Sequence, residues 1–187
     1  MNMDKSVIID AFLSSRMVKK GDYDYFVNPM SDGNPPITKG LLEQIADCII
    51  EQCEMDCDVI LAPEAMAIHY GAALTMETGK PFQIIRKRGT GLPDEITFTT
   101  KTGYGTSQMY VSCLLPGTKV MIVDDVISTG GTLRSMISTL REHDIVVTEV
   151  AVVLNRSKDV SAIAKELEVP IRTVLDVSVA DGKPVVL

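Results

Sequence analysis

Residues 120–132 read Val-Met-Ile-Val-Asp-Asp-Val-Ile-Ser-Thr-Gly-Gly-Thr. The first four form a continuous apolar run, which is typical of a central parallel strand covered on both faces. Two acids, Asp124 and Asp125, follow at once, and a short turn of hydroxyl residues and glycines comes after them. Residues 133–141 then show a helical pattern. The stretch therefore predicts a strand, an acidic pair, a polar loop and a helix, as in an α/β protein.

The turn after the acids has the composition of a phosphate-binding loop. Its glycines let a ligand approach the main chain, and its amides together with the following helix N-terminus attract anions. Its hydroxyls add further donors, so the predicted phosphate-binding residues are Ser128, Thr129, Gly130, Gly131 and Thr132. The two carboxylates repel phosphate and must face another part of the ligand, either neutral hydroxyls or a cation held by them, at the strand end where open α/β sheets bind ligands. A phosphorylated sugar, with its diol against the acids, is the predicted ligand.

This run resembles the phosphoribosyl-pyrophosphate (PRPP) signature of the type I phosphoribosyltransferases. A nucleotide-triphosphate loop would need a Lys directly after its last Gly, and the dinucleotide Gly-x-Gly-x-x-Gly pattern is absent. The resemblance implies an α/β fold with a mostly parallel central sheet flanked by helices, a small N-terminal hood and a flexible hairpin loop. It also implies that Asp124 and Asp125 are the catalytic acids that fix the ribose.

Composition limits the remaining possibilities. The chain has 187 residues, 45% of them hydrophobic, and a net charge of −7. This length predicts a single domain over residues 1–187. The acidic balance speaks against nucleic-acid binding, no apolar run is long enough to span a membrane, and the first residues lack the form of a signal peptide. We therefore expect a cytoplasmic protein with reduced cysteines.

Local patterns predict the other elements. Apolar periodicity and turn residues mark helices and strands. We expect helices at 4–17, from Thr38 or Gly40 to Cys53, from about 69 to 79, and at 160–167, with strands at 22–29, 58–62, 81–85, 145–154 and 170–177. Residues 31–36 read as a loop, and residues 96–111 as a long hairpin whose tip could close over a site.

Two segments are candidates for binding pyrophosphate. Residues 64–69, Glu-Ala-Met-Ala-Ile-His, resemble the corresponding loop of the archaeal hypoxanthine enzymes, with Ala67 in place of a Gly. The contacts implied there come from Ala65, Met66, Ala67 and Ile68. Arg86 and Lys87 end the next strand, either as a solvated charged turn or as a cationic wall for the leaving group. In the family a basic residue here can reach the partner's site, so a homodimer is implied.

The base-binding half has weaker signals. Residues 1–37 correspond to the hood, where Tyr25, Phe26 and Val27 either form a packing cluster or contact the base. Arg156, after a core strand, is either a surface charge or a donor to a 6-oxo group. Related enzymes carry acids at the positions of Ser128 and Gly103, and both positions are neutral here. His69 could contact the ligand, but we expect it to bond to the backbone at a helix start.

Together these features predict a purine phosphoribosyltransferase of purine salvage. It would join hypoxanthine, with or without guanine, to PRPP and release the nucleoside monophosphate (IMP or GMP) and pyrophosphate. Mg²⁺ would arrive on PRPP, without direct protein ligands. Two alternatives stay open: an adenine phosphoribosyltransferase, and a regulator of the same fold that senses PRPP or a purine.

Overall fold

The computed structural model describes residues 4–21, 23–102 and 105–187. Its helices are α1 (Ser6–Leu13), α2 (Pro29–Asp32), α3 (Lys39–Gln52), α4 (Ile68–Thr78), α5 (Gly131–Glu142) and α6 (Val160–Leu167). Its strands are β1 (Arg16–Lys20), β2 (Tyr23–Val27), β3 (Val59–Pro63), β4 (Phe82–Ile85), β5 (Ile96–Thr102), β6 (Gly105–Val111), β7 (Lys119–Ile127), β8 (Val146–Asn155), β9 (Ile171–Ala180) and β10 (Lys183–Val186).

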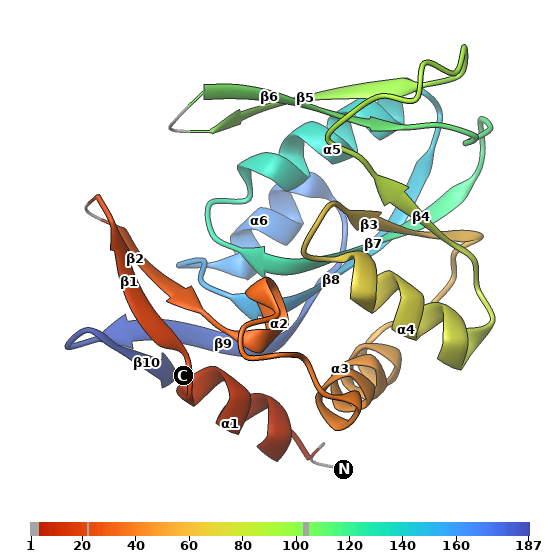
Figure 1. The fold of residues 1–187 in the computed structure, drawn as a ribbon. Helices are drawn as coiled ribbons and strands as arrows, with labels where there is room; N and C mark the ends of the chain where they lie inside the picture. Colours follow the sequence, from red (N-terminus) through yellow and green to blue (C-terminus); the bar gives the residue numbers. More distant parts are fainter. Residues whose placement is uncertain (1–3, 22, 103–104) are drawn as a thin grey trace.

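A six-stranded sheet in the order β10-β9-β8-β7-β3-β4 forms the centre of the molecule. Strands β4, β3, β7, β8 and β9 run parallel, and β10 pairs antiparallel with β9 at one edge. Helices α1, α3 and α4 lie on one face, and α5 and α6 on the other (Figure 1). This arrangement confirms the predicted mostly parallel sheet flanked by helices.

Two hydrophobic clusters fill the space on either side of this sheet. One contains Ile8 and Phe12 of α1 with residues of α3 and α4, and the other contains Leu133 and Met136 of α5 with residues of the β5–β6 hairpin. The apolar run of β7 alternates between them, so Met121 and Val123 face the first cluster and Ile122 the second. A strand in this position needs apolar residues throughout, which explains its sequence.

Two smaller sheets lie outside the central one. The β1–β2 hairpin is N-terminal, and the β5–β6 hairpin crosses over α5, where the Ser135 hydroxyl donates to the carbonyl of Thr99 at 2.6 Å (Figure 1). The hairpin predicted at 96–111 is therefore confirmed. Its tip residues, Gly103 and Tyr104, lie outside the described part of the chain.

Several of the predicted boundaries need correction, and one strand was missed. The first helix ends at Leu13 instead of 17, because residues 16–20 pair with β2 as a strand. The loop predicted at 31–36 begins inside α2, whose cap is Asn28 with Pro29 as its first residue. The acids Asp124 and Asp125 lie within β7, which continues to Ile127 because it keeps pairing with β8. Strand β10 was not predicted.

None of the helices in the described ranges is both long and apolar enough to cross a membrane.

Candidate functional site

The acidic pair lies at the carboxyl end of β7, among the central strands of the sheet. The backbone N–H of Asp125 donates to the Asp124 carboxylate at 2.9 Å. Burial of the Asp124 carboxyl, and secondly the neighbouring Asp125, raise its pKa well above the usual range. Burial also raises the pKa of Asp125, which is 9% exposed, while a hydrogen bond from the Ser31 hydroxyl opposes this shift. Both carboxyl groups are therefore more basic than exposed ones.

The polar loop follows this pair directly. Ser128 and Thr129 are exposed, and Gly130 has φ 76° as the residue that precedes α5. Gly131 and Thr132 belong to the first turn of the helix, which therefore starts two residues earlier than predicted. The first amides of α5 have no partners within the helix, so they form an anion-binding surface beside the loop hydroxyls.

Arg134 fixes the shape of this loop. Its guanidinium donates to the carbonyl of Thr129 and makes a two-point ion pair with Glu166 of α6, with N–O distances of 2.7 and 2.6 Å. A Cβ on Gly130 would lie 3.0 Å from both Arg134 and Ile163. The glycine is therefore required by its positive φ and by close packing against α6. Arg134 was not among the residues predicted from the sequence.

The segment 64–68 connects α4 to β3, which is the strand next to β7. The Glu64–Ala65 peptide bond is cis. The Glu64 N–H donates to the carbonyl of Ile85 at 2.8 Å, and its carboxylate accepts from the backbone N–H of Lys87 at 2.9 Å. Of the segment's side chains, Ala67 is buried and Met66 is 39% exposed. The structure thus brings together the two segments predicted to bind pyrophosphate.

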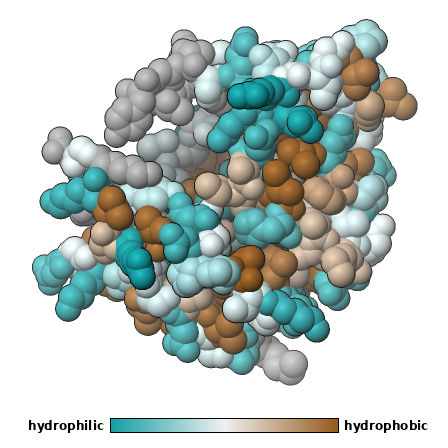
Figure 2. All heavy atoms as spheres, in the orientation of Figure 1, coloured by the Kyte–Doolittle hydropathy of each residue, from teal (hydrophilic) through white to brown (hydrophobic). Residues whose placement is uncertain are grey.

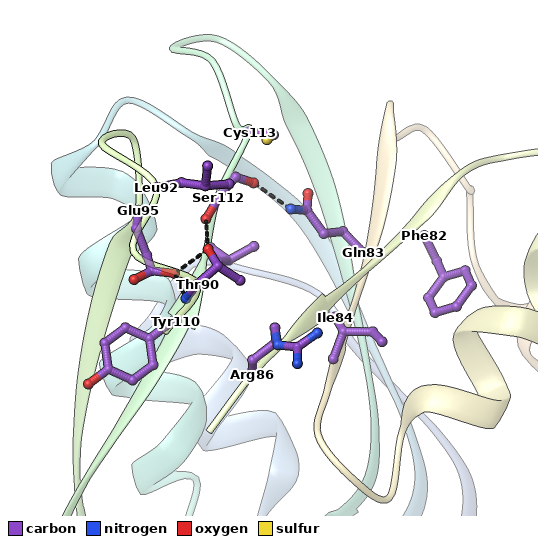
Figure 3. Close-up of a pocket in the computed structure, with 11 residues that line it drawn as sticks. Phe82, Gln83, Ile84, Arg86, Thr90, Leu92, Glu95, Tyr110, Ser112 and Cys113 are labelled. Carbon is purple, nitrogen blue, oxygen red and sulfur yellow. Dashed lines mark hydrogen bonds between the residues drawn. The ribbon is translucent and has the colours of Figure 1, made fainter. Parts of the chain in front are cut away.

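Arg86 belongs to the second of these two segments. It lines a cavity of about 330 Å³ between β4 and β6, with Tyr110 and Thr90 among the other lining residues (Figure 3). Its backbone pairs with Tyr110 through hydrogen bonds of 2.8 and 2.7 Å. This cavity shares no lining residue with the acidic pair. Figure 3 also shows Thr90 hydrogen-bonded to Glu95, which closes the turn after β4.

A second, smaller cavity of about 40 Å³ lies beside Asp125. It is lined by Tyr25, Phe26, Ser31, Asp125, Val126, Leu154 and Arg156. The Arg156 guanidinium lies 4.3 Å from the centre of the Phe26 ring, in a cation–π contact. Three of the four predicted base-binding residues therefore meet here. The fourth, Val27, does not line the cavity.

The helix α2 supplies a residue that the sequence analysis did not select. Ser31 is 7% exposed and faces Asp125 across 94 positions of sequence. The carbonyl of its neighbour Met30 accepts hydrogen bonds from the Tyr70 hydroxyl at 2.7 Å and from Nε2 of His69 at 3.1 Å. The predicted backbone contact of His69 is confirmed. The Asn-Pro pair at 28–29, a helix-start signal, was the available indication that this segment is ordered.

Comparison with known proteins shows the family to which the chain belongs. The family model of the phosphoribosyl transferase domain matches residues 36–180. The hypoxanthine/guanine phosphoribosyltransferase of Methanohalophilus mahii is 41% identical over 165 residues, covering 88% of this chain and 86% of that protein. The protein of the same name from Methanothermobacter thermautotrophicus is 37% identical over 174 residues, covering 93% of this chain and 90% of that protein.

Solved structures agree on the fold. The adenine phosphoribosyltransferase of Thermoanaerobacter pseudethanolicus superimposes with a TM-score of 0.73 at 20% identity, covering 90% of this chain and 99% of that one. The Saccharomyces cerevisiae adenine enzyme gives 0.72 at 20% identity, covering 92% of this chain and 100% of that one. At this identity the likeness concerns the fold alone. With the family model and the archaeal relatives, it shows that the chain belongs to the phosphoribosyl transferase domain family.

Proposed function

We propose that this protein transfers the phosphoribosyl group of PRPP to a 6-oxopurine, hypoxanthine first and guanine second. The observation that carries this proposal is that two half-sites follow the neighbouring parallel strands β7 and β3, whose carboxyl ends lie on the same side of the sheet. The polar loop and acidic pair of β7–α5 form one, and the linked segments around Glu64 and Lys87 form the other. The archaeal relatives carry the name hypoxanthine/guanine phosphoribosyltransferase, which supports this base over adenine.

Each part of the site has a role in this reaction. Residues 128–132 would hold the 5′-phosphate, and the two acids would fix the ribose hydroxyls in attack geometry. The amides of Ala65 to Ile68, with Arg86 and Lys87, would stabilise the charge that develops on pyrophosphate. Carboxylates near C1′ also favour a transition state with cationic ribose character.

Magnesium fits this site as an ion carried by the substrate. Among the described residues, no three His, Cys, Asp or Glu side chains are grouped to hold a metal, and in this proposal the paired acids bind the ribose hydroxyls. When bound on PRPP, Mg²⁺ would neutralise pyrophosphate oxygens. The cationic residues Arg86 and Lys87 would support the same charge from the protein side.

The N-terminal segment would act as the hood over the base. Phe26 and Arg156 offer stacking surfaces, and Tyr25 fixes α2 by donating to the Asp32 carboxylate at 2.7 Å. The cavity of about 40 Å³ is well below the roughly 300 Å³ of ordinary ligand pockets. Base binding would therefore require Arg156 to move off the Phe26 ring, so that the purine takes its place.

A homodimer would complete the pyrophosphate site. Strand β4 is an edge strand, and Arg86 lies in the cavity on its outer side. Apolar residues gather over the region of β3, β4 and the start of α4 (Figure 2). Leu92, which lines the same cavity as Arg86, is 47% exposed. A second copy on this face would cover it and bring Arg86 toward the partner's site, and sedimentation of Leu92→Glu against the natural chain tests this contact.

The base specificity is tested by a panel of purines with PRPP and Mg²⁺, in which pyrophosphate release is followed. Hypoxanthine should give the highest kcat/KM, followed by guanine. If no purine gives turnover, the transferase proposal fails. If adenine exceeds hypoxanthine, the assignment of the base fails while the reaction class stands.

A further inference from the structure

Ser31 is a buried hydroxyl in the cavity proposed for the base. It is 7% exposed, and it shares the cavity lining with Asp125 and with the stacked pair Phe26 and Arg156. Its hydroxyl hydrogen bonds to the Asp125 carboxylate. Because a hydroxyl has one hydrogen and two lone pairs, Ser31 can still accept a hydrogen bond from a ligand N–H while it donates to Asp125.

Hydrogen bonds to the backbone of α2 hold this hydroxyl in place. The Asn28 side-chain oxygen accepts from the N–H groups of Met30 and Ser31 at 2.9 and 3.0 Å. The Met30 carbonyl accepts from Tyr70, which is fully buried in the core, and from His69. Groups fixed in this way can present a proton acceptor without further ordering, which is what efficient catalysis requires.

The proposed reaction needs a proton acceptor. When a purine ring nitrogen forms its bond to C1′, the bond from C1′ to pyrophosphate breaks, and an imidazole N–H of the purine must lose its proton. Ser128 lies in the phosphate loop and has no carboxylate. The acid nearest the cavity is Asp125, and Ser31 contacts it.

We propose that Ser31 and Asp125 together take this proton: the Ser31 oxygen accepts it from the purine N–H and passes its own hydrogen to the Asp125 carboxylate. The carboxylate ends protonated, the hydroxyl is restored, and the purine nitrogen keeps the electron pair that bonds C1′. Water or pyrophosphate then takes the proton from Asp125 as products leave. This inference rests on the proposed function.

The surroundings of Asp125 suit this role. Asp124 adjoins it on β7, Tyr70 and His69 approach from α4, and Arg156 lies across the cavity. Burial raises the pKa of Asp125. A carboxylate that is more basic than an exposed one accepts a proton more readily near neutral pH.

The test compares Ser31→Thr with Ser31→Val, because these side chains share their shape and differ in the hydroxyl. The substrates are hypoxanthine and 8-azahypoxanthine, whose additional ring nitrogen makes its N–H more acidic. Ser14→Ala removes an exposed hydroxyl that donates to the carbonyl of Ala11 and serves as the control. The readouts are kcat and KM for each base, and the PRPP dissociation constant by calorimetry.

We expect Ser31→Val to lower kcat for hypoxanthine about 100-fold, within the range of general base catalysis. The loss should be several-fold smaller for 8-azahypoxanthine, Ser31→Thr should retain activity with both bases, and the PRPP dissociation constant should stay within about twofold. An equal loss with both bases, or a parallel loss of PRPP affinity, would show that Ser31 only positions Asp125. If the natural chain turns over purines and Ser31→Val is unimpaired, this inference fails while the proposed function stands.

Discussion

The hydroxyl of Tyr70 donates a 2.7 Å hydrogen bond to the backbone carbonyl of Met30. This contact joins α4, which follows the segment proposed for pyrophosphate, to α2, which lines the cavity proposed for the base. Burial raises the pKa of Tyr70, so the group stays protonated and remains a donor at all physiological pH values. This buried bond therefore links the two halves of the candidate site, beside the contact of the same carbonyl with Nε2 of His69.

Replacing Tyr70 with Phe should weaken this link without changing the packed ring. We expect a loss of about 1–2 kcal/mol in the free energy of unfolding, as for a buried hydrogen bond, and a higher KM for the base. Urea unfolding and steady-state kinetics measure the two effects. Tyr110→Phe is the matched control, because that hydroxyl bonds Gln108 near the surface. Equal effects of the two changes would contradict the proposed link.

The acidic pair should show a conflict between stability and activity. Burial, followed by the charge of Asp125, raises the pKa of Asp124, so the folded state favours the protonated form. Stability is then lost as the pH rises from the ordinary value of 3.8 through the higher folded pKa. Asp124→Asn should raise Tm at pH 8 relative to the natural chain, and less so near pH 4, while activity falls about 100-fold.

Asp125→Asn should likewise lose activity, because it removes both the ribose contact and the proposed proton acceptor. Scanning calorimetry at pH 4 and pH 8 measures Tm of Asp124→Asn and Asp125→Asn. Glu142→Gln, on the exposed end of α5, is the control. Unchanged turnover in Asp125→Asn would remove this residue from the mechanism.

Arg134 should matter for PRPP more than for the fold. Exposed ion pairs contribute about 0–1 kcal/mol, so Arg134→Lys should change Tm little. The loss of the two-point contact with Glu166 and of the bond to the Thr129 carbonyl should loosen the phosphate loop. We expect KM for PRPP to rise about 3- to 10-fold, the equivalent of one hydrogen bond. Glu43→Gln breaks the remote Lys39–Glu43 pair and should leave KM unchanged.

The four thiols should differ in reactivity. Burial and the adjacent Glu149 raise the pKa of Cys53 to about 12, and burial also raises the pKa of Cys48 and Cys57. Cys113 is exposed. Because the thiolate is the reactive form, a thiol reagent at pH 8 should modify one cysteine quickly, and Cys113→Ser should abolish the fast phase. Two or more fast thiols would contradict this expectation.

The sequence predicted the parts of the fold that depend on local pattern. The apolar run at 120–123 required a strand covered on both faces, and Thr38, one of the two starts considered for the helix ending near Cys53, is the N-cap of α3. The strand β10 was missed because it is four residues long and contains Pro184, which is tolerated at a sheet edge but weakens a strand pattern.

One part of the candidate site could likewise be predicted from a local pattern, and another part could not. The phosphate loop and acids occur together in one stretch, so their composition alone indicates a ligand. Ser31 and Arg134 gave no such signal, because their roles come from contacts with Asp125 and Glu166 in distant parts of the sequence. Such contacts depend on how α2 and α6 pack against the sheet, which no local pattern records.

Gly71 of α4 should be sensitive to substitution. A Cβ there would lie 2.6 Å from the Phe82 ring and 3.0 Å from the Ala62 side chain, so the helix could not keep its distance from β3 and β4. We expect Gly71→Ala to lower the free energy of unfolding by about 1–3 kcal/mol, as for overpacking in a core. Gly40→Ala is the matched control, because its Cβ would meet open space in α3. It should stabilise the helix by up to about 1 kcal/mol. Urea unfolding of both variants measures the difference, and a Gly71→Ala protein as stable as the natural chain would show that α4 can move away from the sheet.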